Sequence, residues 1–135
     1  MNVMFYTVWL NGCFDVLHRG HIEMFKYAKE LGGRVVVGLD TDERVKKLKG
    51  EKRPINKLED RMELVKSLKY VDGVIPFDSD EKLVALLEEF RPQYRVIGGD
   101  YKDKKIVGEE YSGIIKYFDR MPEYSSTNII NVLWN

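Results

Sequence analysis

The sequence lacks the features that would tie the chain to a membrane, to nucleic acid or to an oxidising compartment. Its single cysteine, Cys13, excludes an intrachain disulfide framework and is compatible with a reducing cytoplasm. Lys plus Arg and Asp plus Glu both number 22, so the formal net charge is +0 and no overall field favours nucleic acid or an anionic membrane as a partner. No apolar run approaches the roughly 18 residues that a membrane helix needs. We therefore expect a soluble, cytoplasmic protein whose anion sites are local.

Histidine is scarce as well, since His18 and His21 are the only two. A closed zinc site needs more His or Cys ligands than this chain has, so only a carboxylate-assisted site could form. Surface or core positions are the ordinary alternatives for the two side chains. Their spacing around Gly20, where a strand and turn open a helix, suits a third role, because both imidazoles and several free backbone N–H groups can face one anion. A phosphate chain fits that geometry.

Apolar runs alternate with amphipathic stretches along the chain, which is typical of a parallel α/β sheet. The composition and spacing predict strands at residues 3–10, 34–39, 73–77, 94–97 and 113–118. They predict helices at residues 21–31, 57–68, 79–90 and 127–133, and a short helix capped by residues 40–42. With no linker or repeat, we expect one domain over residues 1–135, built on a Rossmann-like, doubly wound parallel sheet of about five strands.

Polar clusters follow four of the predicted strands, at residues 11–15, 40–42, 98–100 and 119–127. Open α/β sheets bind ligands at the carboxyl ends of their strands. We therefore expect these clusters to converge on one site.

The residues from Gly12 to His21 read Gly-Cys-Phe-Asp-Val-Leu-His-Arg-Gly-His, which resembles the signature of the cytidylyltransferase-like branch of the nucleotidyltransferases. Further family-like segments follow in order, so the resemblance covers essentially the whole domain. They are Thr41-Asp42, the lysines at 46, 47 and 49, Arg53-Pro54, residues 58–61, 70–72, 98–101 and 125–130. The resemblance implies transfer of a nucleoside monophosphate from a triphosphate to a small sugar or polyol phosphate, with release of pyrophosphate.

The chemistry of such a transfer needs charge and position more than proton abstraction. A phosphate monoester has a second pKa near ~6, so at neutral pH the substrate is already an oxyanion nucleophile. The protein must align its attack on the α-phosphorus and stabilise negative charge on the equatorial and leaving oxygens, where one well-placed donor is worth ~3 kcal/mol or more. We predict that His18 and His21 are those donors.

The resemblance also implies the supporting residues. A lysine after the second strand reaches phosphate, for which Lys47 fits best and Lys46 and Lys49 are register alternatives, although a solvated basic face has the same composition. Arg120 matches the arginine that begins the Arg-Thr-x-Gly-x-Ser-Thr-Thr signature of related cytidylyltransferases, but the threonine and glycine are missing here. The remaining predicted nucleotide-binding residues are Gly12, Cys13, Phe14, Asp15, Arg61, Gly99, Asp100, Ser125, Ser126 and Thr127.

Some of these residues have an equally good structural explanation. Ser126 and Thr127 can donate to phosphate at the start of the last helix, and one of them can simply cap it. Arg61 is either a nucleotide contact or a solvated helix arginine, because Lys57, Leu58, Leu64 and Val65 offer it no acidic partner. Mg²⁺ is expected by resemblance, mainly through the triphosphate, with Asp15 as a possible ligand.

Two branches of the family compete for the substrate. The segment 98–101, together with 48–50, 53–56 and 125–130, looks most like domains that adenylylate heptose 1-phosphate. Arg120 and the length of 135 residues resemble glycerol-3-phosphate cytidylyltransferase. We expect ATP and a sugar phosphate as partners, CTP and glycerol 3-phosphate as the alternative, and a homodimer by family resemblance. A nucleotide-binding sensor without turnover is the alternative of another class.

Overall fold

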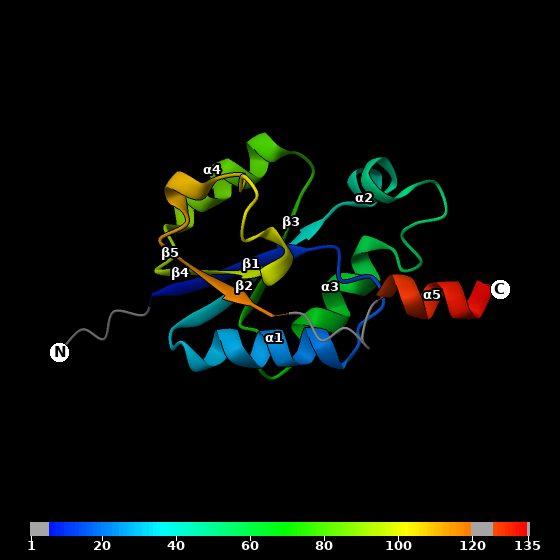
Figure 1. Cartoon of the computed structure of the whole chain (residues 1–135), viewed down its shortest axis with the longest axis horizontal. Helices are drawn as coiled ribbons and strands as arrows, with labels where there is room; N and C mark the ends of the chain where they lie inside the picture. The colour runs from blue at the N-terminus through cyan, green and yellow to red at the C-terminus, as the bar shows by residue number, and fades with distance from the viewer. Residues whose placement is uncertain (1–5, 120–125, 135) are drawn as a thin grey trace.

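The computed structural model describes residues 6–119 and 126–134, and a five-stranded parallel sheet forms its centre (Figure 1). The strands are β1 (Thr7–Gly12), β2 (Arg34–Asp40), β3 (Gly73–Phe77), β4 (Tyr94–Gly98) and β5 (Ile114–Phe118). The helices are α1 (Arg19–Glu30), α2 (Asp42–Lys49), α3 (Leu58–Lys66), α4 (Asp80–Phe90) and α5 (Ser126–Trp134), with 3₁₀ turns η1 (Gly99–Tyr101) and η2 (Glu109–Tyr111).

The strand order is β3-β2-β1-β4-β5, and every neighbouring pair is parallel. The chain winds outward from β1 to β3, then returns to place β4 on the other side of β1. This confirms the predicted doubly wound sheet of five strands in one small domain. Its topological switch point lies between β1 and β4, where sheets of this kind bind ligands.

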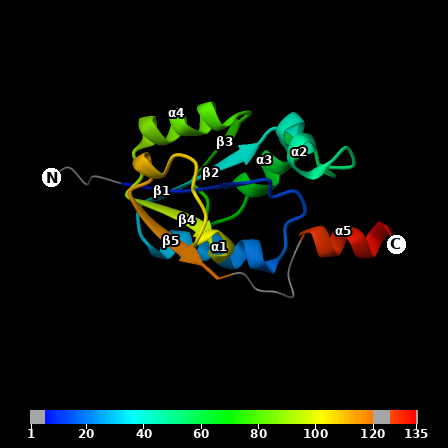
Figure 2. The same ribbon diagram turned by 45° about the horizontal axis from the view of Figure 1, so that its top comes forward.

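Alternating side chains of β1 supply both layers of the core. Val8 and Leu10 face α1 and α3, in a cluster that also contains Phe25 and Val65. Trp9 points to the opposite face and packs with the leucines of α4. Figures 1 and 2 show the resulting layers, with α4 above the sheet and α1 below it. Because both faces are covered, β1 and β2 are nearly continuous apolar runs.

The pairing of β1 with its two neighbours is unequal. β1 pairs with β2 along its full length, up to Gly12 opposite Leu39. With β4 it pairs only at Val8–Tyr94 and Trp9–Arg95. The last part of β1 is therefore released from β4, and the sheet opens at the switch point.

The ends of α1 follow from its sequence. The helix begins at Arg19, before the predicted start at residue 21, because the backbone N–H of His21 already donates to the His18 carbonyl, 3.0 Å away. It ends ahead of two glycines with positive φ, as predicted. A Cβ on Gly33 would lie 2.3 Å from the carbonyl oxygen of Tyr6, so no larger residue fits there.

The predicted cap of the short helix at residues 40–42 is only partly right. Thr41 is the N-cap residue of α2, but its side chain makes no capping hydrogen bond. The Asp42 carboxylate instead accepts from the backbone N–H of Leu58, 2.9 Å away, at the first residue of α3. The acidic side chain thus fixes the start of a later helix. Among the described residues, no helix is long and apolar enough to span a membrane.

Asp72 anchors the start of β2 and gives a pH-dependent prediction. Its Oδ2 accepts from Lys29 Nζ and from the backbone N–H of Val35, each at 2.8 Å. Burial opposes the charged form, but these two bonds lower the pKa of Asp72 below its ordinary 3.8. A carboxyl group with a lowered folded-state pKa stabilises the fold above its unfolded-state pKa, and that contribution disappears as the pH falls through the folded-state value.

We expect Asp72→Asn to lower the free energy of unfolding at pH 7 by under about 1 kcal/mol, because solvent screens an ion pair whose side chains are 40% and 37% exposed. Urea denaturation at pH 7 and at successively lower pH values measures the difference, which is expected to shrink as the pH falls below the ordinary pKa of 3.8. A difference that does not change with pH would show that the charge of Asp72 contributes nothing.

Candidate active site

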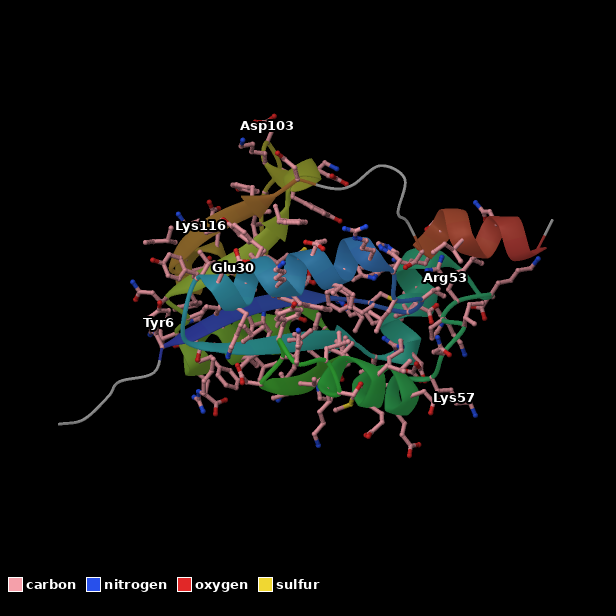
Figure 3. All side chains as sticks on the ribbon, turned by 90° about the horizontal axis from the view of Figure 1, so that it is seen from below. Tyr6, Glu30, Arg53, Lys57, Asp103 and Lys116 are labelled. Atoms are coloured by element: carbon pink, nitrogen blue, oxygen red, sulfur yellow. The ribbon has the colours of Figure 1, made fainter. Side chains whose placement is uncertain are left out.

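A pocket lies where β1 and β4 separate, between the start of α1, the end of α2 and the start of α5. Figure 3 shows the labelled Arg53 at this end of the molecule, near the beginning of α5. Most of the residues predicted for the nucleotide site line the pocket: Gly12, Cys13, Phe14, Asp15, His18, His21, Lys49, Asp100, Ser126 and Thr127. Lys46, Lys47, Arg61 and Gly99 are not in its lining, and Arg120 and Ser125 lie outside the described residues.

The turn that opens the pocket is built around Phe14. Its backbone φ of 47° lies in the left-handed region, which a bulky residue rarely adopts. The ring packs against His21 and Phe25, with centroids 5.2 Å and 5.0 Å away. A Cβ on Gly12 would lie 3.2 Å from this ring, so glycine leaves room for it. The turn thereby holds one histidine of the motif against the core.

Asp15 holds a distant loop against the motif. Its Oδ2 and Oδ1 accept the backbone N–H groups of Ile55 and Asn56, each at 2.7 Å. Arg53 Nε lies 3.3 Å from the same Oδ2. The side chain is fully buried, and three donors already use both oxygens. The role of Asp15 as a possible Mg²⁺ ligand stays a prediction, because the three donors leave one of the four lone-pair sites of the carboxylate unused.

The two histidines lie one above the other at the start of α1. Their ring centroids are 3.8 Å apart and the planes are inclined by 20°. The backbone N–H of His18 donates to His21 Nδ1 at 3.3 Å, which makes Nδ1 an acceptor and Nε2 the donor of that neutral ring. Since the first N–H groups of a helix carry partial positive charge, the pair and the helix start together favour an anion.

Lys49, rather than Lys47, reaches the pocket. Both belong to the last turn of α2, but residues two apart on a helix point to opposite sides. Burial raises the pKa of the Cys13 thiol, and the nearby positive charge of Lys49 opposes this rise to a smaller extent. Cys13 therefore stays a neutral thiol at neutral pH and forms part of the wall. The structure favours Lys49 for the phosphate-reaching lysine, where the sequence favoured Lys47.

Arg61 is fully buried, which overturns its interpretation as a solvated helix arginine. Its guanidinium donates to the carbonyls of Cys13, Asp40 and Asn56 at 2.8–3.0 Å and to the Asp42 carboxylate at 2.7 Å. The acidic partner comes from the start of α2, not from its own helix. Arg61 thus joins the ends of β1 and β2 to the loop after α2, behind the pocket.

Ser126 and Thr127, two predicted phosphate donors at the start of α5, have different contacts. The Ser126 hydroxyl donates to the Val16 carbonyl at 2.6 Å, so its only proton ties α5 to the histidine motif. Thr127 is exposed and lines the pocket.

At the end of β4, Gly98 and Asp100 line the pocket, whereas a Cβ on Gly99 would lie 2.8 Å from Asp119 Oδ1. A larger residue at position 99 would require the Asp119 side chain to move, so Gly99 packs closely against the residue that follows β5.

Arg53 was missed by the sequence reasoning. It lines the pocket although it is only 8% exposed, and its Nη2 is buried without a hydrogen-bond partner among the described residues. A buried guanidinium with unused donors is suited to a phosphate group. The available signal was Pro54, because a residue before proline avoids helical conformation, which places Arg53 in the loop after the basic helix. Asn11 and Tyr101 also line the pocket and were not predicted.

The described side chains do not form a metal site of their own. No group of three or more His, Cys, Asp or Glu residues within 6–119 and 126–134 could hold an ion. What the pocket does offer is a set of cationic and N–H donors at the switch point of a doubly wound sheet. Such a site binds phosphate groups.

These features define a nucleotidyltransferase. Residues 9–132 match the family described as cytidylyltransferase-like, and the chain belongs to that family. Enzymes of this group generally use a divalent metal ion.

The curated relatives of this chain are longer proteins. The bifunctional protein HldE of Campylobacter fetus subsp. fetus is 45% identical over 124 residues, which cover 92% of this chain and 27% of that protein. The bifunctional protein HldE of Campylobacter concisus is 44% identical over 124 residues, which cover 92% and 26%. The chain thus spans about a quarter of the length of these relatives.

Solved structures share the fold. The lipopolysaccharide core biosynthesis protein from Thermoplasma volcanium GSS1 superimposes with a TM-score of 0.68 at 24% identity, over 87% of this chain and 98% of that one. At this identity the likeness supports the fold alone.

Proposed function

We propose that residues 1–135 form one nucleotidyltransferase domain that transfers the adenylyl group of ATP to a heptose 1-phosphate-like sugar phosphate. One observation carries the reaction type: His18, His21, Lys49 and Arg53 line a single pocket at the switch point of the sheet. The choice of a sugar phosphate is supported by the segment 98–101 and by the HldE relatives at 44–45% identity.

The reaction needs no dedicated base. An oxygen of the sugar phosphate attacks the α-phosphorus, the bond from that phosphorus to the bridging oxygen breaks, and pyrophosphate leaves with the electron pair. The attacking phosphate is already ionised at neutral pH. The histidines at the start of α1 donate hydrogen bonds to the oxygens on which negative charge develops.

The remaining groups hold the phosphates in line. Lys49, the last residue of α2, and Arg53, in the loop that follows, supply positive charge. Thr127 and the first N–H groups of α5 supply donors from the opposite side. Arg120 and Ser125 complete this set in our proposal. Mg²⁺ bound together with the nucleotide would offset part of the negative charge of the triphosphate, with Asp15 as a possible protein ligand.

Lys49 and Lys47 form a matched pair for testing this arrangement. We expect Lys49→Ala to lower kcat/KM for pyrophosphate release by about 10- to 100-fold, because it removes a charge-assisted contact to phosphate. We expect Lys47→Ala, outside the pocket lining, to change it less than about threefold. Steady-state rates of the two variants under identical conditions give the comparison. The reverse order would return the role to Lys47.

A substrate matrix tests the proposed function. Pyrophosphate release is measured with ATP or CTP against heptose 1-phosphate and glycerol 3-phosphate, with His18→Ala as the blank. We expect ATP with heptose 1-phosphate to give the highest kcat/KM. CTP with glycerol 3-phosphate as the best pair would establish the cytidylyl branch instead. No pair above the blank would favour a nucleotide-binding sensor.

The assembly is a further part of this proposal. We propose a homodimer that acts in the cytoplasm on a nucleoside triphosphate and a phosphorylated sugar, without nucleic acid or membrane partners. Light scattering at several protein concentrations measures the mass, and a monomer at all of them would contradict the dimer.

A further inference from the structure

The mechanism above does not use Asn11, although this side chain lines the pocket at the end of β1. Its amide oxygen accepts two hydrogen bonds from side chains of the sheet. Trp9 Nε1 donates to Asn11 Oδ1 at 3.0 Å, and Arg95 Nη2 donates to the same oxygen at 3.1 Å. The two donor residues lie on the adjacent strands β1 and β4, where they are directly opposite each other in the strand pairing.

These bonds fix which end of the amide faces the pocket. The indole N–H and the guanidinium are donors only, so the group opposite them must be the amide oxygen and cannot be the NH₂. Trp9 is fully buried and Arg95 is 4% exposed, so neither donor can easily turn to water. Asn11 Nδ2 is therefore left on the pocket side, with no hydrogen-bond partner among the described residues.

Arg95 is an unusual residue to place there. Among the described residues it makes no ion pair, and its other bonds go to the Val107 carbonyl and the Ser112 hydroxyl, at 2.6 Å and 3.0 Å. Burial lowers the pKa of Arg95 to about 10, so the side chain is still cationic at neutral pH. A buried cation without a carboxylate partner lowers the stability of the fold, so its presence here points to a role in function.

The position of this contact is also informative. β1 and β4 lose their backbone pairing directly after Trp9 and Arg95. The bond from Arg95 to Asn11 crosses the gap that opens there, beneath the pocket. An amide with its oxygen on a cation presents the positive end of its dipole on the other side.

We propose that Asn11 donates a hydrogen bond to a phosphate oxygen of a bound substrate, with Arg95 as the positioning residue that orients and polarises its amide. The inference deepens the proposed function, on which it rests. The phosphate belongs either to the nucleotide or to the sugar phosphate, and separate titrations distinguish these two sources.

Asn11→Asp is the decisive substitution. The new carboxylate can still accept from Trp9 and Arg95, and it gives Arg95 the counter-ion that it lacks. We expect the variant to fold with a Tm equal to or above that of the parent chain. It loses the N–H donor and places an anion against phosphate, so we expect affinity for one substrate to fall by about 10- to 100-fold or more.

Calorimetric titration with ATP and, separately, with heptose 1-phosphate measures the effect. Loss of ATP affinity alone assigns the contact to the nucleotide, and loss of heptose 1-phosphate affinity alone assigns it to the acceptor. A folded variant that keeps both affinities within twofold overturns the proposal. A variant that fails to fold also overturns the proposal, because it shows that the carboxylate does not accept the hydrogen bonds of Trp9 and Arg95 as the amide oxygen does.

A double-mutant comparison tests the positioning role of Arg95. Arg95→Met is expected to weaken the affected substrate about tenfold in the parent chain but less than twofold in an Asn11→Ala background. Equal effects in both backgrounds would show that Arg95 acts only on the fold. If the parent chain is inactive with every substrate pair, the proposed function is wrong, but the Asn11 contact can still be tested. Titration with inorganic pyrophosphate then compares the affinity of Asn11→Asp with that of the parent chain. Equal pyrophosphate affinities of the two would then overturn the Asn11 contact.

Discussion

Replacing His18 by alanine is expected to lower kcat/KM for pyrophosphate release by about 100- to 1,000-fold, while the protein stays folded. The imidazole stacks on His21 at the start of α1, where negative charge of the transition state would develop. Removing a preorganised donor from such a position affects the transition state more than the bound substrate. The main loss should therefore appear in kcat, with a smaller change in KM.

The measurement needs a control at the same helix start. Arg19 is the next residue, its side chain is 67% exposed, and it pairs weakly with Glu23 at 3.7 Å. We expect Arg19→Ala to keep kcat within about twofold. Circular dichroism of both variants checks that α1 still forms. If His18→Ala retains more than about a tenth of the parent rate, the histidine is not a principal donor and the reaction relies on the other cationic groups.

The fold could be predicted from the sequence because its signals are local and repeated. Apolar runs such as residues 34–39 are buried on both faces, so hydrophobicity alone marks them as strands. Glycines after α1 and the serine before α4 mark helix ends by their own chemistry, and Ser79 indeed accepts the N–H of Lys82 at 3.1 Å. Residues 11–15, 98, 100 and 126–127 line one pocket, as expected for the carboxyl ends of parallel strands, whereas the predicted cluster at residues 40–42 does not line it.

Sequence reasoning is least informative for side chains whose partners are distant in sequence. Arg61 looks like a surface residue on its own helix, but Asp42, 19 positions earlier, binds it. Arg53 meets Asp15 across 38 positions, and no pattern of neighbours contains that contact. The choice between Lys47 and Lys49 depends on the rotation of α2 at its last turn, where sequence position is least reliable. Hydroxyls such as Ser126 can cap, tether or bind phosphate, and only geometry distinguishes these roles.

Arg61→Met is expected to lower the free energy of unfolding by about 3–5 kcal/mol, the largest stability effect that we predict. The substitution preserves much of the buried volume but removes four hydrogen bonds. It leaves the carbonyls of Cys13, Asp40 and Asn56 without this donor, and the carboxylate of Asp42 without its ion pair. Arg61→Lys should recover little, because a single ammonium cannot reach the positions served by the planar guanidinium.

Urea denaturation of Arg61→Met and of Lys66→Met, an exposed position on the same helix, separates this effect from general changes in α3. We expect the control to lie within about 0.5 kcal/mol of the parent chain. A similar small change for Arg61→Met would show that its bonds do not hold the loop. Kinetics at a temperature where the variant is still folded address the predicted nucleotide contact. Since all four bonds of Arg61 go to the protein, we expect the KM for ATP to rise less than about threefold, and a much larger rise in KM would establish direct contact with the nucleotide.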